Sequence, residues 1–289
     1  MLRPTRRWAV AAAAAIALTA LTPALASAAT LGPALGGPTA PAPDTSPATD
    51  FRGTVALSNC SGAIVRWNSS APTDDALMLT NGHCYDFLGA REVVVDIPSV
   101  RSVDLLAADG SVAGTVNTTR LLYSTMWTTD VSLYQLGVTY KQLQDQYGVP
   151  AFTLADSKPA PTDQPISIIS GYWKTEYDCN LNGFAYKLHE YVWTWRKSMR
   201  YSDGGCQIIG GTSGSPVLDK NRVQIGINNT INEDGEHCTL NNPCEENRKG
   251  KISVHLHRGY GQQTWVFYTC LSGDDQLNLD KSGCRLPKP

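Results

Sequence analysis

The sequence predicts an all-β protein that carries one short helix in the body of the chain. Short apolar or alternating runs recur from residue 54 onward, and turn residues separate them. Only residues 139–147 show a helical stripe, and Gly148 and Pro150 follow it as a stop signal. Many short strands with few helices are typical of a β-barrel or a β-sandwich. The strands that we expect are residues 63–65, 76–79, 91–98, 131–136, 166–169, 191–195, 217–218 and 223–227.

The composition is that of a globular protein with enough apolar residues for a core. Of the 289 residues, 42% are hydrophobic and 17% are charged, and the formal net charge is −2. A nucleic-acid-binding protein usually carries a basic stripe, so this balance argues against nucleic acid as a partner. It gives no indication of an anionic membrane surface as a partner either.

The N-terminal residues have the three parts of an export signal. Three arginines precede an Ala/Leu-rich run over residues 8–21, and residues 24–26 and 26–28 both fit the small-x-small cleavage rule. A membrane span is the alternative, but the run is shorter than the roughly 20 residues that a bilayer requires, and Pro23 interrupts it. We therefore expect a signal peptide over residues 1–28, and a secreted, extracellular protein with no membrane contact once the peptide is removed.

Residues 29–50 consist mainly of Ala, Pro, Gly and Thr and hold hardly any large apolar side chain. Such a segment buries too little surface to offset its chain entropy. We expect a flexible linker or a short pro-segment there. The folded domain is expected over residues 51–289, as two sub-barrels with a boundary near residues 145–165.

Eight cysteines in an exported chain favour disulfide bonds over free thiols. A zinc site is the alternative, but no Cys-x-x-Cys pair occurs in the chain. We therefore expect no metal and no cofactor. The residues that could be drawn as a zinc set are His237, Cys238, Cys244, His255 and His257.

Three short motifs hold side chains suited to nucleophilic catalysis. Ser213 lies in a Gly/Ser-rich segment, and a serine hydroxyl needs a base to take its proton. His83 follows an apolar strand, and the imidazole pKa suits proton transfer near neutral pH. Asp130 precedes an alternating strand, and a carboxylate beside a histidine fixes its tautomer. Each motif alone also fits an ordinary turn, a structural histidine or a strand-edge aspartate.

Together, in the order His, Asp, Ser, these motifs resemble those of the chymotrypsin-like (trypsin-like) serine protease family, in its bacterial secreted branch. The resemblance covers about residues 52–232, and it implies two six-stranded antiparallel β-barrels with few short helices. The segments that carry it are Cys60-Ser61-Gly62-Ala63-Ile64-Val65, Thr80-Asn81-Gly82-His83-Cys84, Thr129-Asp130-Val131-Ser132-Leu133 and Gly211-Thr212-Ser213-Gly214-Ser215-Pro216.

The resemblance implies a secreted serine endopeptidase that works through an acyl-enzyme. Ser213 would be the nucleophile, His83 the base and Asp130 the orienting carboxylate, while the N–H groups of Gly211 and Ser213 would form the oxyanion hole. Polypeptides would be the substrates, with proteinaceous inhibitors as further partners, and we expect a monomer.

The resemblance also pairs Cys60 with Cys84. Proximity in the sequence suggests three further pairs, which are Cys179 with Cys206, Cys238 with Cys244, and Cys270 with Cys284.

The chain departs from the family pattern at several positions. Thr212 stands where animal members carry an aspartate that pairs with a freed N-terminus, so we expect no such switch. Gln207 replaces the aspartate that anchors Arg or Lys in trypsin-like members. Asn228 replaces the histidine of glutamate-specific bacterial relatives. We take Gln207, Asn228 and Asn229 as the candidate substrate-binding residues.

Alternatives to this interpretation stay open. A catalytically silent protein that keeps the protease fold as a binding module would share all of these motifs. An α/β-hydrolase is disfavoured because the order Ser, Asp, His and the long helices of that class are missing.

The aromatic strand at residues 191–195 is expected to pack in a barrel, although it could form a ligand platform. The acidic residues 233–236 could favour basic substrates or bind calcium, but a solvated loop is the simpler interpretation.

Overall fold

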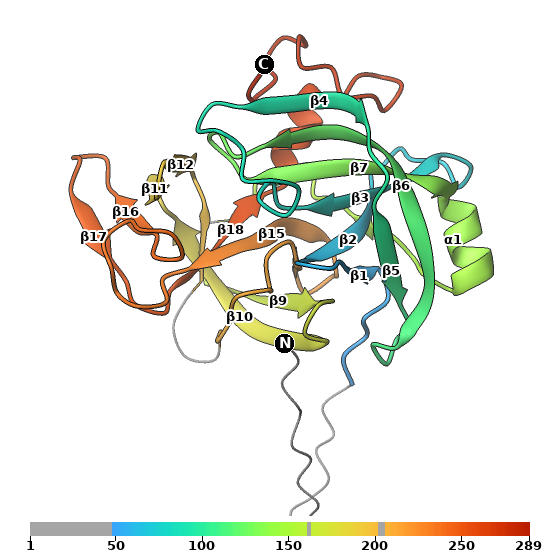
Figure 1. Ribbon diagram of the computed structural model, residues 1–289, viewed down its shortest axis with the longest axis horizontal. Coiled ribbons are helices and arrows are strands. Elements are labelled where there is room, and N and C mark those ends of the chain that lie inside the picture. The colour runs from blue at the N-terminus through green and yellow to red at the C-terminus, as the bar shows by residue number, and fades with distance from the viewer. Residues whose placement is uncertain (1–47, 161–162, 202–205) are drawn as a thin grey trace, which may run out of the picture. The chain divides into compact units, whose positions relative to one another are not determined.

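The computed structural model describes residues 48–160, 163–201 and 206–289, and every structural statement below concerns these residues (Figure 1). The expected signal peptide and residues 29–47 of the expected linker lie outside them. The described residues all belong to one compact unit.

The first part of this unit is a closed barrel of six antiparallel strands in the order β1-β5-β6-β7-β3-β2, which the pairing of β1 with β2 closes. Strand β4 pairs with β6 outside the barrel, and β8 adds to β2 in parallel. The strands are β1 (Thr54–Ala56), β2 (Ser61–Arg66), β3 (Asp75–Thr80), β4 (Val93–Pro98), β5 (Ser102–Leu106), β6 (Val112–Thr125), β7 (Val131–Thr139) and β8 (Phe152–Thr153).

The expected helix is confirmed as α1 (Tyr140–Tyr147), which follows β7. The Thr139 hydroxyl accepts the N–H of Gln142, and the Gln142 side chain accepts the N–H of Thr139, which together form a capping box. At the other end Gly148 takes the left-handed conformation, with a φ of 65°, which ends the helix. The predicted stop signal therefore acts through backbone geometry.

The second barrel is closed by six antiparallel strands in the order β10-β13-β18-β15-β14-β9. The expectation of two six-stranded antiparallel barrels with few short helices is thereby confirmed. The strands are β9 (Gln164–Ser170), β10 (Thr175–Phe184), β13 (Met199–Tyr201), β14 (Pro216–Leu218), β15 (Gln224–Ile231) and β18 (Gly259–Gln263).

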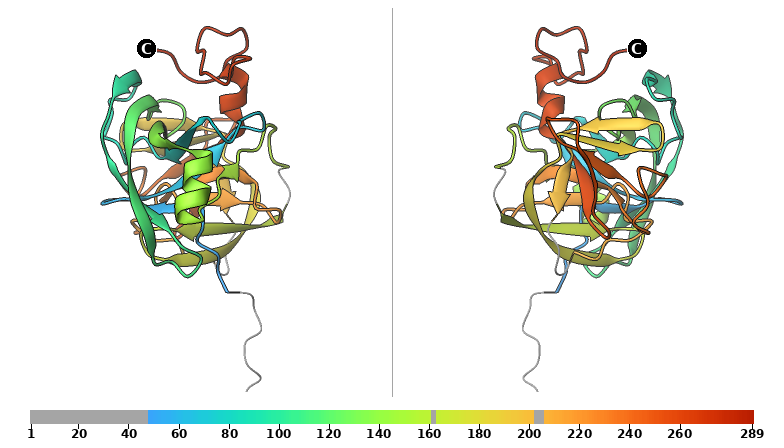
Figure 2. Two further views of the ribbon diagram at one scale, coloured as in Figure 1. Left: turned by 90° about the vertical axis from the view of Figure 1, so that its right-hand side faces the viewer. Right: turned by 90° about the vertical axis from the view of Figure 1, so that its left-hand side faces the viewer.

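Two insertions in the second barrel build a third sheet that the sequence analysis did not foresee. We call it the accessory sheet. Its strand order is β12-β11-β16-β17, and Figure 2 (right) shows it from the side on which it lies. The strands are β11 (Lys187–Glu190), β12 (Trp193–Arg196), β16 (Cys244–Glu246) and β17 (Ile252–Val254).

The aromatic strand was expected to pack in a barrel, and the structure corrects this to β12 of the accessory sheet. The indole N–H of Trp193 donates to the Leu88 carbonyl at 2.9 Å, and that of Trp195 donates to the Met126 carbonyl at 3.0 Å. Both carbonyls belong to loops of the first barrel. Since a buried indole N–H requires an acceptor, these contacts attach the accessory sheet to the first barrel.

After β18 the chain continues through the 3₁₀ helix η1 (Trp265–Cys270) and packs against the first barrel. Phe267 is fully buried and contacts the rings of Trp67 and Tyr123. The Tyr123 hydroxyl donates to the Pro287 carbonyl at 2.9 Å. No helix among the described residues is both long and apolar enough to cross a membrane.

All eight cysteines are paired, in the four pairs that the sequence analysis named: Cys60–Cys84, Cys179–Cys206, Cys238–Cys244 and Cys270–Cys284. Four disulfide bonds are typical of a protein that resides in an oxidising compartment, outside the cell or in a periplasm.

Candidate active site

The first barrel brings His83 and Asp130 together. His83 lies just after β3 and Asp130 just before β7, and these strands pair antiparallel with Thr80 opposite Ser132. The end of one strand therefore meets the start of the other. The His83 Nδ1 atom lies 2.8 Å from Asp130 Oδ2, and the backbone N–H of His83 donates to Asp130 Oδ1 at 3.0 Å.

Gly82 lets the histidine segment lie close against Thr125 and Asp130. A Cβ at position 82 would lie 2.3 Å from the Thr125 carbonyl oxygen and 2.8 Å from Asp130 Oδ1. A side chain there would therefore require the neighbouring backbone or the carboxylate to shift.

The surroundings of the pair make the charged imidazole of His83 more stable, relative to the neutral form, than it is in water. Burial opposes protonation of His83, but the charge and hydrogen bond of Asp130 outweigh it and raise the pKa of His83 above its usual value. Asp130 is completely buried, and the Asn81 amide donates to its backbone carbonyl at 2.9 Å. Asn81 thus fixes the backbone of Asp130, and the two hydrogen bonds from His83 hold its carboxylate.

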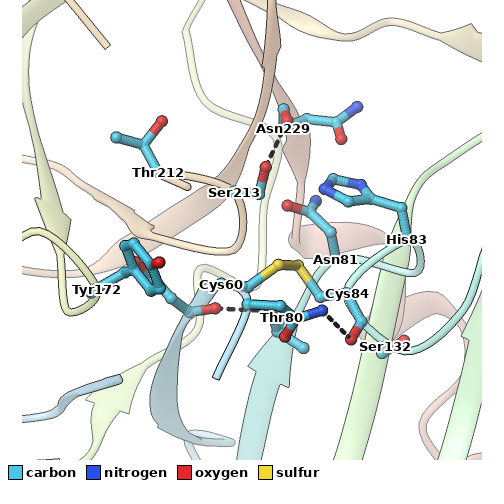
Figure 3. The surroundings of a disulfide bond; sticks show 12 residues. Cys60, Thr80, Asn81, His83, Cys84, Ser132, Tyr172, Thr212, Ser213 and Asn229 are labelled. Carbon is cyan, nitrogen blue, oxygen red and sulfur yellow. Dashed lines mark hydrogen bonds between the residues drawn. A yellow bond between two sulfur atoms is a disulfide. The ribbon is translucent and has the colours of Figure 1, made fainter. Parts of the chain in front are cut away.

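Ser213 reaches the same place from the second barrel, as Figure 3 shows together with the Cys60–Cys84 disulfide. The Ser61 N–H of β2 donates to the Ser213 carbonyl at 2.8 Å. Next to it, Gly214 has a φ of 79°, and a Cβ there would lie 2.2 Å from the Ser61 carbonyl oxygen and from Thr80 Oγ1. The glycine lets the serine segment press directly against the first barrel.

Ser213, His83 and Asp130 line one cavity, which we call the site cavity. The His83 ring points toward Ser213 in Figure 3. The Ser213 hydroxyl donates to the Asn229 carbonyl at 3.3 Å. In this conformation the serine is close to the histidine but is not engaged with it.

Two backbone N–H groups beside Ser213 are free to bind an oxyanion. Neither the Gly211 N–H nor the Ser213 N–H donates to a carbonyl in the part of the chain that the structure describes. The indole N–H of Trp173 donates to the Gly210 carbonyl at 2.7 Å. Because a trans peptide is planar, fixing this carbonyl also fixes the direction of the Gly211 N–H. Trp173 escaped the sequence analysis, since an exposed tryptophan after a strand carries no signal for such a contact.

The comparisons with known proteins assign the family. The trypsin-like peptidase domain matches residues 60–227, which is more than half of the chain. The chain belongs to the trypsin-like peptidase family.

Solved structures similar to this trypsin-like peptidase include the MamO protease domain from Magnetospirillum magneticum in its apo form. It shares 14% sequence identity with a TM-score of 0.47, and the match covers 78% of this chain and 98% of that one. A Glu endopeptidase in complex with MPD shares 16% identity with a TM-score of 0.42, covering 75% of this chain and 88% of that one. No curated protein matches the chain.

The candidate substrate-binding residues of the peptidase fall in three different places. Gln207 is exposed and does not line the site cavity. Asn228 is fully buried, and its amide donates to Thr212 Oγ1 at 2.9 Å, so it acts on the site through Thr212. The Thr212 hydroxyl in turn donates to the Ile209 carbonyl at 2.6 Å. Asn229 alone of the three candidates lines the cavity.

Glu190, at the end of β11, is a residue of the site that no sequence motif points to. It lines the site cavity with only 4% of its surface exposed. The Asn241 N–H donates to its Oε1 atom at 3.0 Å. Burial raises the pKa of Glu190 to about 7, although the nearby Thr230 hydroxyl and the Asn241 N–H favour the charged form.

The cysteines near histidines in the peptidase are bonded to each other. Cys60 and Cys84 lie beside His83, and Cys238 and Cys244 lie beside His237, but each pair forms a disulfide. A disulfide has no thiolate to offer a metal ion. The zinc set considered from the sequence loses two of its five ligands in this way.

Proposed function

We propose that the protein is a secreted serine endopeptidase that hydrolyses peptide bonds through Ser213, His83 and Asp130. The observation that supports this most is the shared cavity, in which the hydrogen-bonded His83–Asp130 pair of one barrel faces Ser213 of the other. These residues come from three separate segments of the chain. The family supports peptide-bond hydrolysis as the reaction.

The first step would be a rotation of the serine side chain. The Nδ1 atom of His83 is occupied by Asp130, so Nε2 is the nitrogen left for the serine. Turning the Ser213 hydroxyl from the Asn229 carbonyl to Nε2 gives up a hydrogen bond of 3.3 Å, which is at the long end of the range. The rotation therefore costs little.

The chemical steps follow from these positions. The Ser213 Oγ atom attacks the scissile carbonyl carbon while its proton passes to His83 Nε2, and the oxyanion that forms accepts the N–H groups of Gly211 and Ser213. The tetrahedral species collapses, and the leaving amine takes the proton from His83. Water then attacks the acyl-enzyme with His83 as the base again, which frees the acid and restores the serine. Asp130 stays ionised and stabilises the imidazolium in both halves.

The setting of the reaction is part of the proposal. Four disulfides and the signal-like N-terminal sequence support an enzyme that is exported and acts on polypeptides outside the cell as a monomer. Because the uncharged Thr212 is held by neutral hydrogen bonds, activity should not depend on one particular N-terminal residue.

A catalytically silent binding protein is the second candidate, and the Ser213–Asn229 hydrogen bond is the observation that favours it. A peptide library incubated with the exported protein, followed by mass spectrometry of the products, separates the two. We expect cleavage by the wild type and none by Ser213→Ala, and labelling of Ser213 by a fluorophosphonate. Intact peptides together with an unlabelled serine would overturn the proposal.

A further inference from the structure

Glu190 has a hydrogen-bonding capacity that the protein itself does not use. Its Oε1 atom accepts the Asn241 N–H, but its Oε2 atom is buried and has no hydrogen-bond partner among the described residues. The Thr230 hydroxyl is near the carboxyl but is not in hydrogen-bonding geometry with Oε2. A buried carboxyl oxygen without a partner costs free energy, so the site is incomplete as it stands.

A second unsatisfied group lines the same cavity. The side-chain amide of Asn229 is buried, and neither its oxygen nor its nitrogen has a partner among the residues that the structure describes. Whichever way the amide is turned, it offers an acceptor oxygen. Two buried acceptors therefore border one cavity, and both lack a donor.

Several of the other side chains that line the site cavity are apolar. Trp193 contributes from the accessory sheet, while Ile209 and Leu240 stand at the opening with 48% and 45% of their surfaces exposed. Such walls suit the methylene stem of a long side chain whose tip carries several donors. Lysine and arginine are the amino acids that have this form.

We propose that Glu190, assisted by Asn229, recognises the cationic side chain of a lysine or arginine in the substrate peptide, which enters the site cavity beside His83. The inference rests on the proposed function, whose substrate class it names. Gln207, at the position where the family's anchoring aspartate is missing, does not line this cavity. The negative charge is thus supplied from another element, the accessory sheet.

The charges around Glu190 favour a cation as the missing ligand. From the first barrel, Asp130 repels the Glu190 carboxylate, whereas His83 attracts it only when protonated. Glu233, on the loop after β15, adds a further carboxylate to the cavity rim. A bound ammonium or guanidinium would offset both the repulsion and the burial, and would hold Glu190 in its charged form.

The test compares peptides that differ by one charge. Lysine is replaced by norleucine, which keeps the four-carbon stem and loses the ammonium, at each of the four positions on either side of the cleaved bond. We expect one position at which lysine gives a kcat/KM at least about tenfold higher than norleucine at pH 8, and we expect Glu190→Gln to bring this ratio close to one. The ratio cancels the titration of His83, because both peptides meet the same enzyme.

The control variant is Glu236→Gln, which removes an exposed carboxylate on the loop beside the cavity and should leave the ratio unchanged. A lysine-to-norleucine ratio near one at all positions overturns the inference, and so does a ratio that survives in Glu190→Gln. Should Glu190→Gln fail to fold, Glu190→Asp takes its place: it keeps the charge but shortens the side chain, and it should lower the ratio.

Binding to Ser213→Ala separates this inference from the proposed function. Calorimetric titration with the lysine peptide and the norleucine peptide needs no catalysis. Tighter binding of the lysine peptide, lost in the double variant with Glu190→Gln, would support the role of Glu190 even if the wild type cleaved nothing. Equal binding of both peptides would overturn it even if the enzyme cleaved other peptides.

Discussion

The two sides of the site cavity differ in how their ionisable groups are paired. On the first-barrel side, His83 and Asp130 hold each other through two hydrogen bonds, and the Asn81 amide donates to the Asp130 backbone carbonyl. On the accessory-sheet side, one carboxyl oxygen of Glu190 and the side-chain amide of Asn229 on β15 have no hydrogen-bond partner among the described residues. Groups that perform chemistry have to be fixed before the substrate arrives, whereas groups that recognise it have to be left free.

Removing the charge of Asp130, on the first-barrel side of the cavity, should cause the largest loss of activity. Asp130→Asn keeps the size of the side chain, but it no longer fixes the His83 tautomer or stabilises the imidazolium. We expect kcat to fall by about 10⁴-fold. The pKa of His83 should fall as well, because the carboxylate is what raises it, so the acidic limb of the pH profile should move to lower pH. Steady-state kinetics from pH 5 to 9 measure both.

Asp96→Asn is the matched control for this substitution. Asp96 lies on β4 with 60% of its side chain exposed and pairs with Arg120. A loss of activity as large in this control as in Asp130→Asn would mean that the effect is one of general stability.

Glu190, on the accessory-sheet side of the cavity, can be tested through the pH dependence of the free energy of unfolding. The expected effect is smaller. Burial raises the pKa of Glu190 from 4.5 to about 7, so between these values the folded state binds more protons than the unfolded state. The stability that this group contributes is complete below pH 4.5 and is lost as pH rises through 7. Relative to Glu190→Gln, the wild type should therefore lose about 3 kcal/mol of unfolding free energy between pH 4.5 and pH 8.

Urea unfolding at a series of pH values measures this difference, and Glu236→Gln again provides the exposed control. Parallel stability curves for the wild type and Glu190→Gln would show that the carboxyl is not strained by its burial. The comparison between the two sides of the cavity would then lose its energetic basis.

The difference between the two sides also explains what the sequence could predict. The motifs around His83, Asp130 and Ser213 lie at strand ends and in a glycine-rich turn, where local sequence constrains geometry. The helix α1 was predictable for the same reason, since its cap residues Thr139 and Gly148 are adjacent to it.

Features that depend on distant pairing escaped prediction. The long strand β6 has a polar, Thr-rich stretch without clear alternation, and its neighbours β4, β5 and β7 stabilise it as a strand. Glu190 becomes part of the site only because β11 pairs with β16, and Asn241, in the segment before β16, lies 51 residues farther along the chain.

Trp173 offers the finest test, because in the proposed mechanism it orients an oxyanion donor without touching the substrate. In Trp173→Phe an aromatic ring stays next to Tyr172, but the indole donor to the Gly210 carbonyl is gone. The Gly210–Gly211 peptide can then rotate, so its N–H is directed at the oxyanion for a smaller part of the time. Since one neutral hydrogen bond contributes about 1 kcal/mol, we expect kcat to fall by roughly five- to tenfold.

KM should hardly change in Trp173→Phe, because the oxyanion forms only in the transition state. Tyr172→Phe is the control, since it alters the neighbouring aromatic ring and leaves the indole N–H in place. A rise in KM with kcat preserved would mean that Trp173 binds substrate instead of orienting the peptide. Trp173 would then have no part in orienting the Gly211 N–H group. The glycines alone would have to orient the oxyanion donors.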